Sequence, residues 1–204
     1  EKNECFNWSF NWFNSVNLCE KEKMKKTIIF FTGIVVALVG VYVSLPNAID
    51  LLGFSGSAFF SGEVWRIITF PFVHVSNAHL VENLLALFIL TLLSYEFKMK
   101  VRAFVSLFFA SGILLAFFGG LVYPYLVIVG SSLGVYSIFG ALTIKGQDYI
   151  PRYVLPRLFA IFIIMNVFYN YFTGDSFVQP LYHAIAFVVG AGLFSLGKRT
   201  KVLE

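Results

Sequence analysis

Residues 103–123 read AFVSLFFASGILLAFFGGLVY, a run of 21 residues without Asp, Glu, Lys or Arg. An α-helix rises ~1.5 Å per residue, so about 20 apolar residues cross the ~30 Å hydrocarbon core of a bilayer. A buried helix of a soluble protein more often has about 10–14 such residues. The run therefore predicts a transmembrane helix.

The composition of the whole chain agrees with a membrane location. Of its 204 residues, 58% are hydrophobic, 19% aromatic and 13% charged, whereas an average soluble domain has about 25% charged residues. A core of this size cannot bury the 25 Phe side chains, so much of the apolar surface must face lipid. The net charge of +4 does not indicate nucleic-acid binding, because Lys and Arg stand in short clusters between apolar runs. We therefore expect membrane lipids, and no nucleic acid, among the partners.

Six runs along the chain meet the length and polarity requirement for a helical span. They are residues 27–45, 79–95, 103–123, 130–144, 154–172 and 177–197, of which the fourth is short for a complete crossing. The first run is longer than the apolar region of a signal peptide, about 7–15 residues, so we interpret it as a span. The predicted fold is an all-α bundle of six transmembrane helices. Residues 27–197 form its membrane domain, and residues 1–26 and 198–204 form N-terminal and C-terminal cytoplasmic tails.

The distribution of cations predicts the orientation of these spans. Thirteen of the 15 Lys and Arg would lie on one membrane face if six spans alternate in direction. Because basic loops remain in the cytoplasm, we expect both termini to be cytoplasmic and the protein to reside in the cell membrane. Arg66 is the cation that this arrangement places on the outer side.

The connection of residues 46–78 is a long and unusually apolar loop. A solvated linker would be polar, so we expect this outer loop to lie on, or partly in, the outer leaflet. Within it, Trp65 is typical of an aromatic anchor at the membrane interface. Arg66 is typical of a group that fixes a loop or binds lipid headgroups.

Four polar side chains fall at nearly the same predicted depth in three of the spans. At ~1.5 Å per residue from the cytoplasmic ends, Ser132, Asn83 and His183 lie about 20–22 Å up their helices. His79 lies one turn above Asn83. A lone Ser in a membrane helix usually bonds a carbonyl one turn back, and a lone His often reaches interfacial water. Four such residues together favour a functional site.

These side chains suit acyl transfer. Ser132 would be the nucleophile and His183 the base that takes its proton. His79 and Asn83, four residues apart on one helix face, would bind the oxyanion together with the backbone N–H of Ser132. Tyr136, one turn after Ser132, would stack on the imidazole of His183. This chemistry implies no metal and no other cofactor.

Small residues near these side chains indicate close helix packing. Ala186 and Gly190 follow His183 by three and seven residues, and the fourth span carries Gly134 and Gly140. Such residues let helix backbones approach closely, as a Ser–His hydrogen bond of ~2.6–3.2 Å requires. We therefore expect the fourth and sixth spans to be neighbours, with these small residues at their contact.

An ordered set of motifs extends over residues 63–190. It consists of Glu63-Val64-Trp65-Arg66, His74, His79-Leu80-Val81-Glu82-Asn83, Gly130-Ser131-Ser132, Tyr136, Gly140, His183, Ala186 and Gly190. The set resembles the rhomboid family of intramembrane serine proteases. The resemblance implies a rhomboid-like fold with Ser132 as nucleophile, His183 as base and no acidic third member. It also implies His79 and Asn83 as oxyanion ligands, and substrates that are transmembrane proteins cut near the outer end of their helix.

One position departs from the family pattern. The family has Gly directly after the nucleophile, where this chain has Leu133 and a Gly one place later. Ser131 therefore competes with Ser132 for the nucleophile's role, and we favour Ser132 because Tyr136 and Gly140 then follow at the family's distances. Leu133 also leaves open a catalytically inactive rhomboid-like protein that binds membrane proteins. A small transporter is the third interpretation, disfavoured because the intramembrane polar groups gather in the outer half.

Glu82 is a carboxylic acid inside the second predicted span. An ionised carboxylate is costly in a bilayer, so it needs a partner or access to water. Glu82 stands three residues after His79, on the same side of the helix. We expect it to tune His79 or to pair with Arg66.

Overall fold

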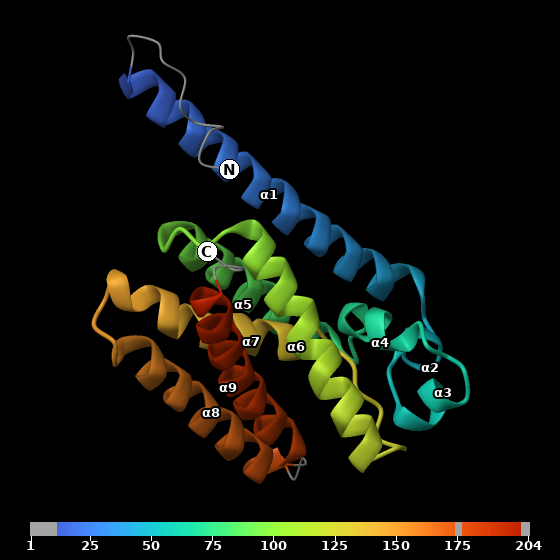
Figure 1. Cartoon of the computed structure of the whole chain (residues 1–204). Coiled ribbons are helices and arrows are strands. Elements are labelled where there is room, and N and C mark those ends of the chain that lie inside the picture. The colour runs from blue at the N-terminus through green and yellow to red at the C-terminus, as the bar shows by residue number, and fades with distance from the viewer. Residues whose placement is uncertain (1–11, 174–176, 201–204) are drawn as a thin grey trace.

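A computed structural model describes residues 12–173 and 177–200 (Figure 1). Over these residues the chain is helical, and its β-structure is a single antiparallel bridge between Phe54 and Ile128. The all-α class is thus confirmed for the described part of the chain. In order, the helices are α1 (Trp12–Ser44), α2 (Ala48–Leu52), α3 (Gly56–Phe60), α4 (Arg66–Thr69), η1 (Phe70–Phe72), α5 (Asn77–Glu96), α6 (Val101–Val122), α7 (Ser132–Lys145), η2 (Gly146–Asp148), α8 (Val154–Thr173) and α9 (Val178–Arg199).

Five of the six predicted spans are helices long and apolar enough to cross a membrane. They are α1, through its part Lys25–Ser44, and α5, α6, α8 and α9. The predicted fourth span is α7, whose 14 residues extend about 21 Å, less than the ~30 Å hydrocarbon core. Most residues of α7 are buried. This helix therefore lies inside the bundle rather than against lipid.

The other helices are arranged around α7. It contacts α5, α6, α8 and α9, and α9 is its most extensive neighbour (Figure 1). Only 11% of the apolar segment of α1, and the same share of α8, is buried, so these two helices lie at the periphery. Because α1 begins at Trp12, residues 12–26 of the predicted N-terminal tail continue the first span as one helix.

Glycines bring α7 and α9 together. A Cβ atom built on Gly140 would collide with the carbonyl oxygen of Phe187, and one built on Gly190 would collide with that of Ser137. Ala186 is fully buried beside them. The expected contact between the fourth and sixth spans is therefore confirmed, and Gly140 and Gly190 lie directly in it.

Gly134 does not contribute to that contact, contrary to our expectation. A Cβ on Gly134 would lie 2.5 Å from a ring carbon of Phe108, which belongs to α6. Gly134 precedes Gly140 by six residues, which is about 240° around a helix, so the two glycines point to different neighbours. Gly134 therefore permits the approach of α6.

The apolar loop of residues 46–78 folds into α2, α3, α4 and η1, and α3 and α4 pack against α6 (Figure 1). Arg66 fixes this loop. Its Nε donates to Glu63 Oε2 at 2.7 Å, and its Nη1 donates to the carbonyl of Gly53 at 2.8 Å. The Nη2 of Arg66 donates to the carbonyl of Asp50, and the indole N–H of Trp65 donates to Leu51 O at 3.2 Å. The two side chains thus satisfy carbonyls at the end of α2.

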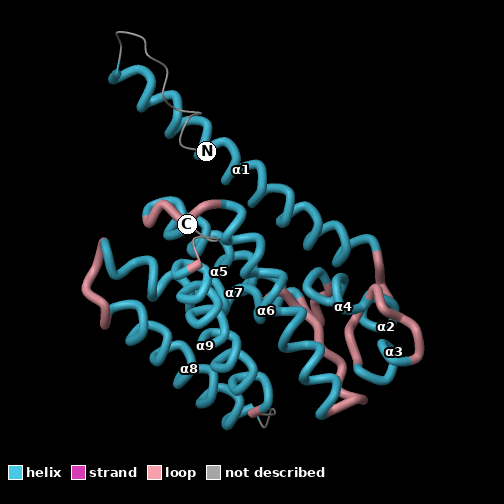
Figure 2. Tube along the Cα trace, in the orientation of Figure 1, coloured by secondary structure: helices cyan, strands magenta, loops and turns pink. Residues whose placement is uncertain are grey.

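An irregular segment, residues 123–131, joins α6 to α7. Figure 2 shows it as loop that returns from the end of α6 toward the interior of the bundle. The bridge to Phe54 fixes it at Ile128, with N–H···O distances of 3.0 and 2.7 Å. Non-helical backbone at membrane depth is tolerated where protein surrounds it or where it lines a cavity. This segment delivers the first residue of α7 to the interior.

Candidate active site

Ser132 is the first residue of α7, and a tight turn positions it there. Gly130, two residues earlier, has φ +98°, a left-handed conformation that strongly favours glycine. Its N–H donates to the carbonyl of Phe70 at 3.0 Å. A Cβ on Gly130 would lie 2.7 Å from Cε1 of His79, so the imidazole of His79 packs directly against this turn. The turn therefore brings the start of α7 and the start of α5 together.

The N-terminus of α7 supplies backbone donors at the same place. Ser131 is the N-cap residue, and its side chain makes no capping hydrogen bond. The N–H groups in the first turn of an α-helix have no partner within the helix, and the helix dipole gives this end partial positive charge. Ser132 itself is 9% exposed, so these donors lie in a largely desolvated place. Such a helix start can stabilise a developing negative charge.

His183 lies on α9, facing α7. Its ring stacks on that of Tyr136, with ring centroids 4.2 Å apart and planes 21° apart. Tyr136 is one helical turn after Ser132 and so lies on the same face of α7. The imidazole is buried, and its Nδ1 has no hydrogen-bond partner among the described residues. The structure thus places Ser132 and His183 on facing sides of two closely packed helices.

His79 and Asn83 come from the first two turns of α5. The side chain of Ser76 caps this helix by accepting from the N–H of His79 at 3.2 Å, which fixes where the helix begins. The Nδ2 of Asn83 donates to the carbonyl of His79 at 2.8 Å and keeps a second N–H for another acceptor. Neither ring nitrogen of His79 has a partner within the described part of the chain. Both side chains can therefore donate to a substrate oxygen.

His74 belongs to the motif set, but the sequence did not predict its contact with His79. His74 is buried beside Phe72, whose backbone is a weak hydrogen-bond partner of the imidazole, and no other hydrogen-bond partner of its ring nitrogens lies among the described residues. Its ring meets that of His79 edge to face, with centroids 5.0 Å apart. Burial, and to a lesser degree repulsion from His79, lowers the pKa of His74 from 6.5 to about 4. His74 is therefore neutral near pH 7 and supports the ring of His79.

The structure corrects one prediction about Arg66 and describes the surroundings of Glu82 and Leu133. Arg66 pairs with Glu63, three residues before it, so the suggested pair between Arg66 and Glu82 was wrong. Glu82 is exposed on α5, and its carboxylate attracts the imidazole of His79 electrostatically, in agreement with the expectation that it tunes this histidine. Leu133 is 4% exposed and packs in an apolar cluster with Phe70 of η1. Its side chain fills the space between α7 and the outer loop.

Together these features define a multi-helix membrane protein in which the helix that begins with Ser132 packs tightly against the helix that carries His183. Residues 61–198 match the model of the Rhomboid domain, which is more than half of the chain. The chain therefore belongs to the rhomboid family, and with its apolar helices it is a multi-pass membrane protein.

Two relatives show how distant the similarity is. Rhomboid-type serine protease 2 of Saccharomyces cerevisiae is 27% identical over 158 residues, which cover 72% of this chain and 60% of the yeast protein. Rhomboid-related protein 2 of Mus musculus is 29% identical over 108 residues, which cover 50% of this chain and 35% of the mouse protein. The chain thus spans less than two thirds of the length of either relative.

Proposed function

We propose that this protein is an intramembrane serine endopeptidase with Ser132 and His183 as its catalytic pair. The observation that carries the proposal is the stack of His183 on Tyr136, one turn from Ser132, across the tight α7–α9 contact. A serine hydroxyl needs a neighbouring base before it is a useful nucleophile, and this geometry supports such a base.

In the proposed mechanism, Ser132 Oγ attacks the carbonyl carbon of the scissile peptide bond while His183 takes the hydroxyl proton. The charge that develops on the carbonyl oxygen is stabilised by the N–H of Ser132 and by His79 and Asn83. Collapse of this intermediate breaks the C–N bond, and His183 gives its proton to the leaving amine. Water then hydrolyses the acyl-enzyme, with His183 again as base, and restores Ser132.

The expected substrates are transmembrane proteins cut near the outer end of their helix. A peptide bond within a regular helix is shielded from attack, so the substrate must unwind locally to enter the site. We further propose a six-span topology in the cell membrane, with both termini cytoplasmic. The basic residues at one end of the bundle support this orientation, because Lys98, Lys145 and Lys198 line a common pocket there.

The test is cleavage of a transmembrane substrate by the purified protein in detergent. Ser132→Ala and His183→Ala should each abolish cleavage, whereas Ser137→Ala should retain it. Ser137 is a matched control, because it is a fully buried serine on the same helix. Ser131→Ala decides between the two adjacent serines. If Ser131→Ala is inactive and Ser132→Ala is active, Ser131 is the nucleophile.

A catalytically inactive member of the family is the second candidate. Leu133 is the feature that favours it, because it stands where the family has Gly directly after the nucleophile. A fluorophosphonate probe phosphonylates an activated serine with loss of fluoride. Labelling that disappears in Ser132→Ala supports the protease, and unlabelled wild-type protein supports the inactive member.

A further inference from the structure

A second polar feature lies at the other end of α7 from Ser132. It is a pocket of about 260 Å³ between the α5–α6 connection, the end of α7 and the last turns of α9. A cavity holds a water molecule from ~10–15 Å³ upward, so this pocket has room for a much larger polar group. Its charged lining residues are Lys98, Lys100, Lys145, Lys198 and Asp148.

The positive charge of this pocket is poorly compensated. Within the described part of the chain, no carboxylate lies within 4.0 Å of the amino groups of Lys98, Lys145 or Lys198. Lys145 is half-buried at the last turn of α7, whereas Lys98 and Lys198 are exposed. Placing an ammonium group in such a position without a counter-ion is unfavourable. The pocket therefore favours an anion.

The backbone at Lys98 supports a functional role for its side chain. Lys98 has φ 54°, a left-handed conformation that glycine usually occupies just after a helix. The end of α5 is closed by hydrogen bonds from Lys98 N to Tyr95 O at 3.0 Å and from Met99 N to Ser94 O at 2.8 Å. A lysine is strained in this conformation, and such strain tends to be retained where the side chain has a task.

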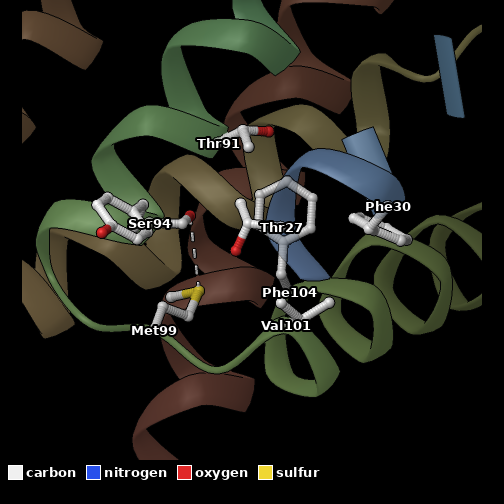
Figure 3. A pocket seen from close by; sticks show the side chains of 8 residues that line it. Thr27, Phe30, Thr91, Ser94, Met99, Val101 and Phe104 are labelled. Atoms are coloured by element: carbon white, nitrogen blue, oxygen red, sulfur yellow. Dashed lines mark hydrogen bonds between the residues drawn. The ribbon is translucent and has the colours of Figure 1, made fainter. Parts of the chain in front are cut away.

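The remaining lining of the pocket is apolar. Phe194 and Met99 are both buried at its wall. Met99, whose sulfur accepts from Ser94 Oγ at 3.9 Å, also lines a narrow crevice with Thr27 and Phe104 (Figure 3). The pocket thus combines lysines at helix ends, where lipid headgroups lie, with an apolar wall that continues toward the hydrocarbon.

We propose that this pocket binds the headgroup phosphate of an anionic phospholipid. Phosphate is a compact anion that several ammonium groups can contact at once, and basic pockets between membrane helices on the cytoplasmic side bind such headgroups. The position of the lysines at the ends of membrane helices and the apolar wall beside them favour a lipid over a soluble phosphate. This site is independent of the catalytic proposal, since it requires neither Ser132 nor His183.

The test measures thermal midpoints in an uncharged detergent while lipid is added. Dioleoylphosphatidylglycerol should raise the midpoint of the wild-type protein saturably, and dioleoylphosphatidylcholine, with the same chains, should not. The pocket variant carries Lys98→Gln, Lys145→Gln and Lys198→Gln. Because each lysine contributes about a fivefold affinity gain near an anionic lipid, we expect at least tenfold weaker binding of phosphatidylglycerol.

A matched variant controls for total charge. It carries Lys25→Gln, Lys26→Gln and Arg152→Gln, which remove the same charge from exposed residues outside the pocket. This control should bind phosphatidylglycerol as the wild type does. Equal weakening in both triple variants, or no preference for phosphatidylglycerol in the wild type, would overturn the proposal. The third ligand tested is inorganic phosphate. If inorganic phosphate alone raises the thermal midpoint fully, and phosphatidylglycerol raises it no further, the assignment of the site to a lipid is overturned.

The single substitution Lys98→Gly distinguishes an effect on lipid binding from an effect on folding. Glycine relieves the left-handed strain, so the midpoint in phosphatidylcholine should rise, while the affinity for phosphatidylglycerol should fall about fivefold. An affinity that stays unchanged in Lys98→Gly would exclude this side chain from the site. A variant that merely folds poorly would instead lower the midpoint without lipid.

Discussion

The substitution Gly190→Ala tests whether the α7–α9 contact determines the geometry of the catalytic pair. The added Cβ would lie 2.5 Å from both the carbonyl carbon and the Oγ of Ser137. Because non-bonded carbon atoms normally stay about 3.5–4.0 Å apart, the two helices must separate by about 1 Å. Overpacking of this kind lowers the free energy of unfolding by about 1–3 kcal/mol.

The same displacement should reduce catalysis. His183 lies two turns before Gly190 on α9, so a shift of the helix moves the imidazole relative to Ser132. A misplacement of about 1 Å can reduce a rate about 100-fold. The assay is the initial rate of cleavage of a transmembrane substrate, measured with the thermal midpoint of the same purified protein in the same detergent.

Gly192→Ala is the matched control for this prediction. It lies on the same helix, and a Cβ there would have no atom of a neighbouring element within 4 Å. Alanine is the better helix former by up to about 1 kcal/mol, so Gly192→Ala should retain the rate and keep or raise the midpoint. If Gly190→Ala behaves like Gly192→Ala in both measurements, the helix contact does not control the site and our reasoning is refuted.

Three further predictions concern the side chains around the site. Tyr136→Phe should retain the cleavage rate, because the ring still stacks on His183. Tyr136→Ala should lower the cleavage rate about 2- to 10-fold. Equal rates in the two variants would show that the stack is unimportant. Arg66→Lys keeps the positive charge but loses the guanidinium group that donates hydrogen bonds to three partners. The free energy of unfolding, measured in thermal or denaturant melts, should fall by about 1.5–3 kcal/mol. An unchanged value would contradict the role of Arg66 in fixing the loop. The pKa of His74 falls from 6.5 in the unfolded chain to about 4 in the folded protein, so the unfolded chain binds the proton first as the pH is lowered. The free energy of unfolding should therefore be greatest above pH 6.5 and decline by up to about 3 kcal/mol as the pH falls to 4. His74→Gln should flatten this decline relative to the wild type, and parallel pH curves would show that His74 is not its source.

The features that the sequence predicts well are those set by the local pattern along one helix. Apolar runs of about 20 residues with few charged residues identify α5, α6, α8 and α9, because a bilayer imposes a fixed length and polarity. The stack of Tyr136 on His183 also follows from spacing, since a residue one turn after Ser132 must share its face.

The features that the sequence does not predict depend on the rotation of one helix against another. The partner of Gly134 is Phe108 on α6 rather than α9, and no pattern within α7 distinguishes the two neighbours. Arg66 pairs with Glu63 rather than Glu82, because the loop folds into short helices and places Glu63 one turn before Arg66. The contact of His74 with His79 likewise depends on how η1 leads into α5.

The position of Ser132 at the very start of α7 determines where the length of this chain can change during evolution. One residue inserted between Ser132 and Gly140 would rotate the serine about 100° away from α9, because the glycine contact holds the rest of the helix in place. An insertion near Pro124, before the bridge at Ile128, would only enlarge a surface turn. Insertions and deletions among homologues should therefore accumulate on the α6 side of this junction and be absent from the first two turns of α7.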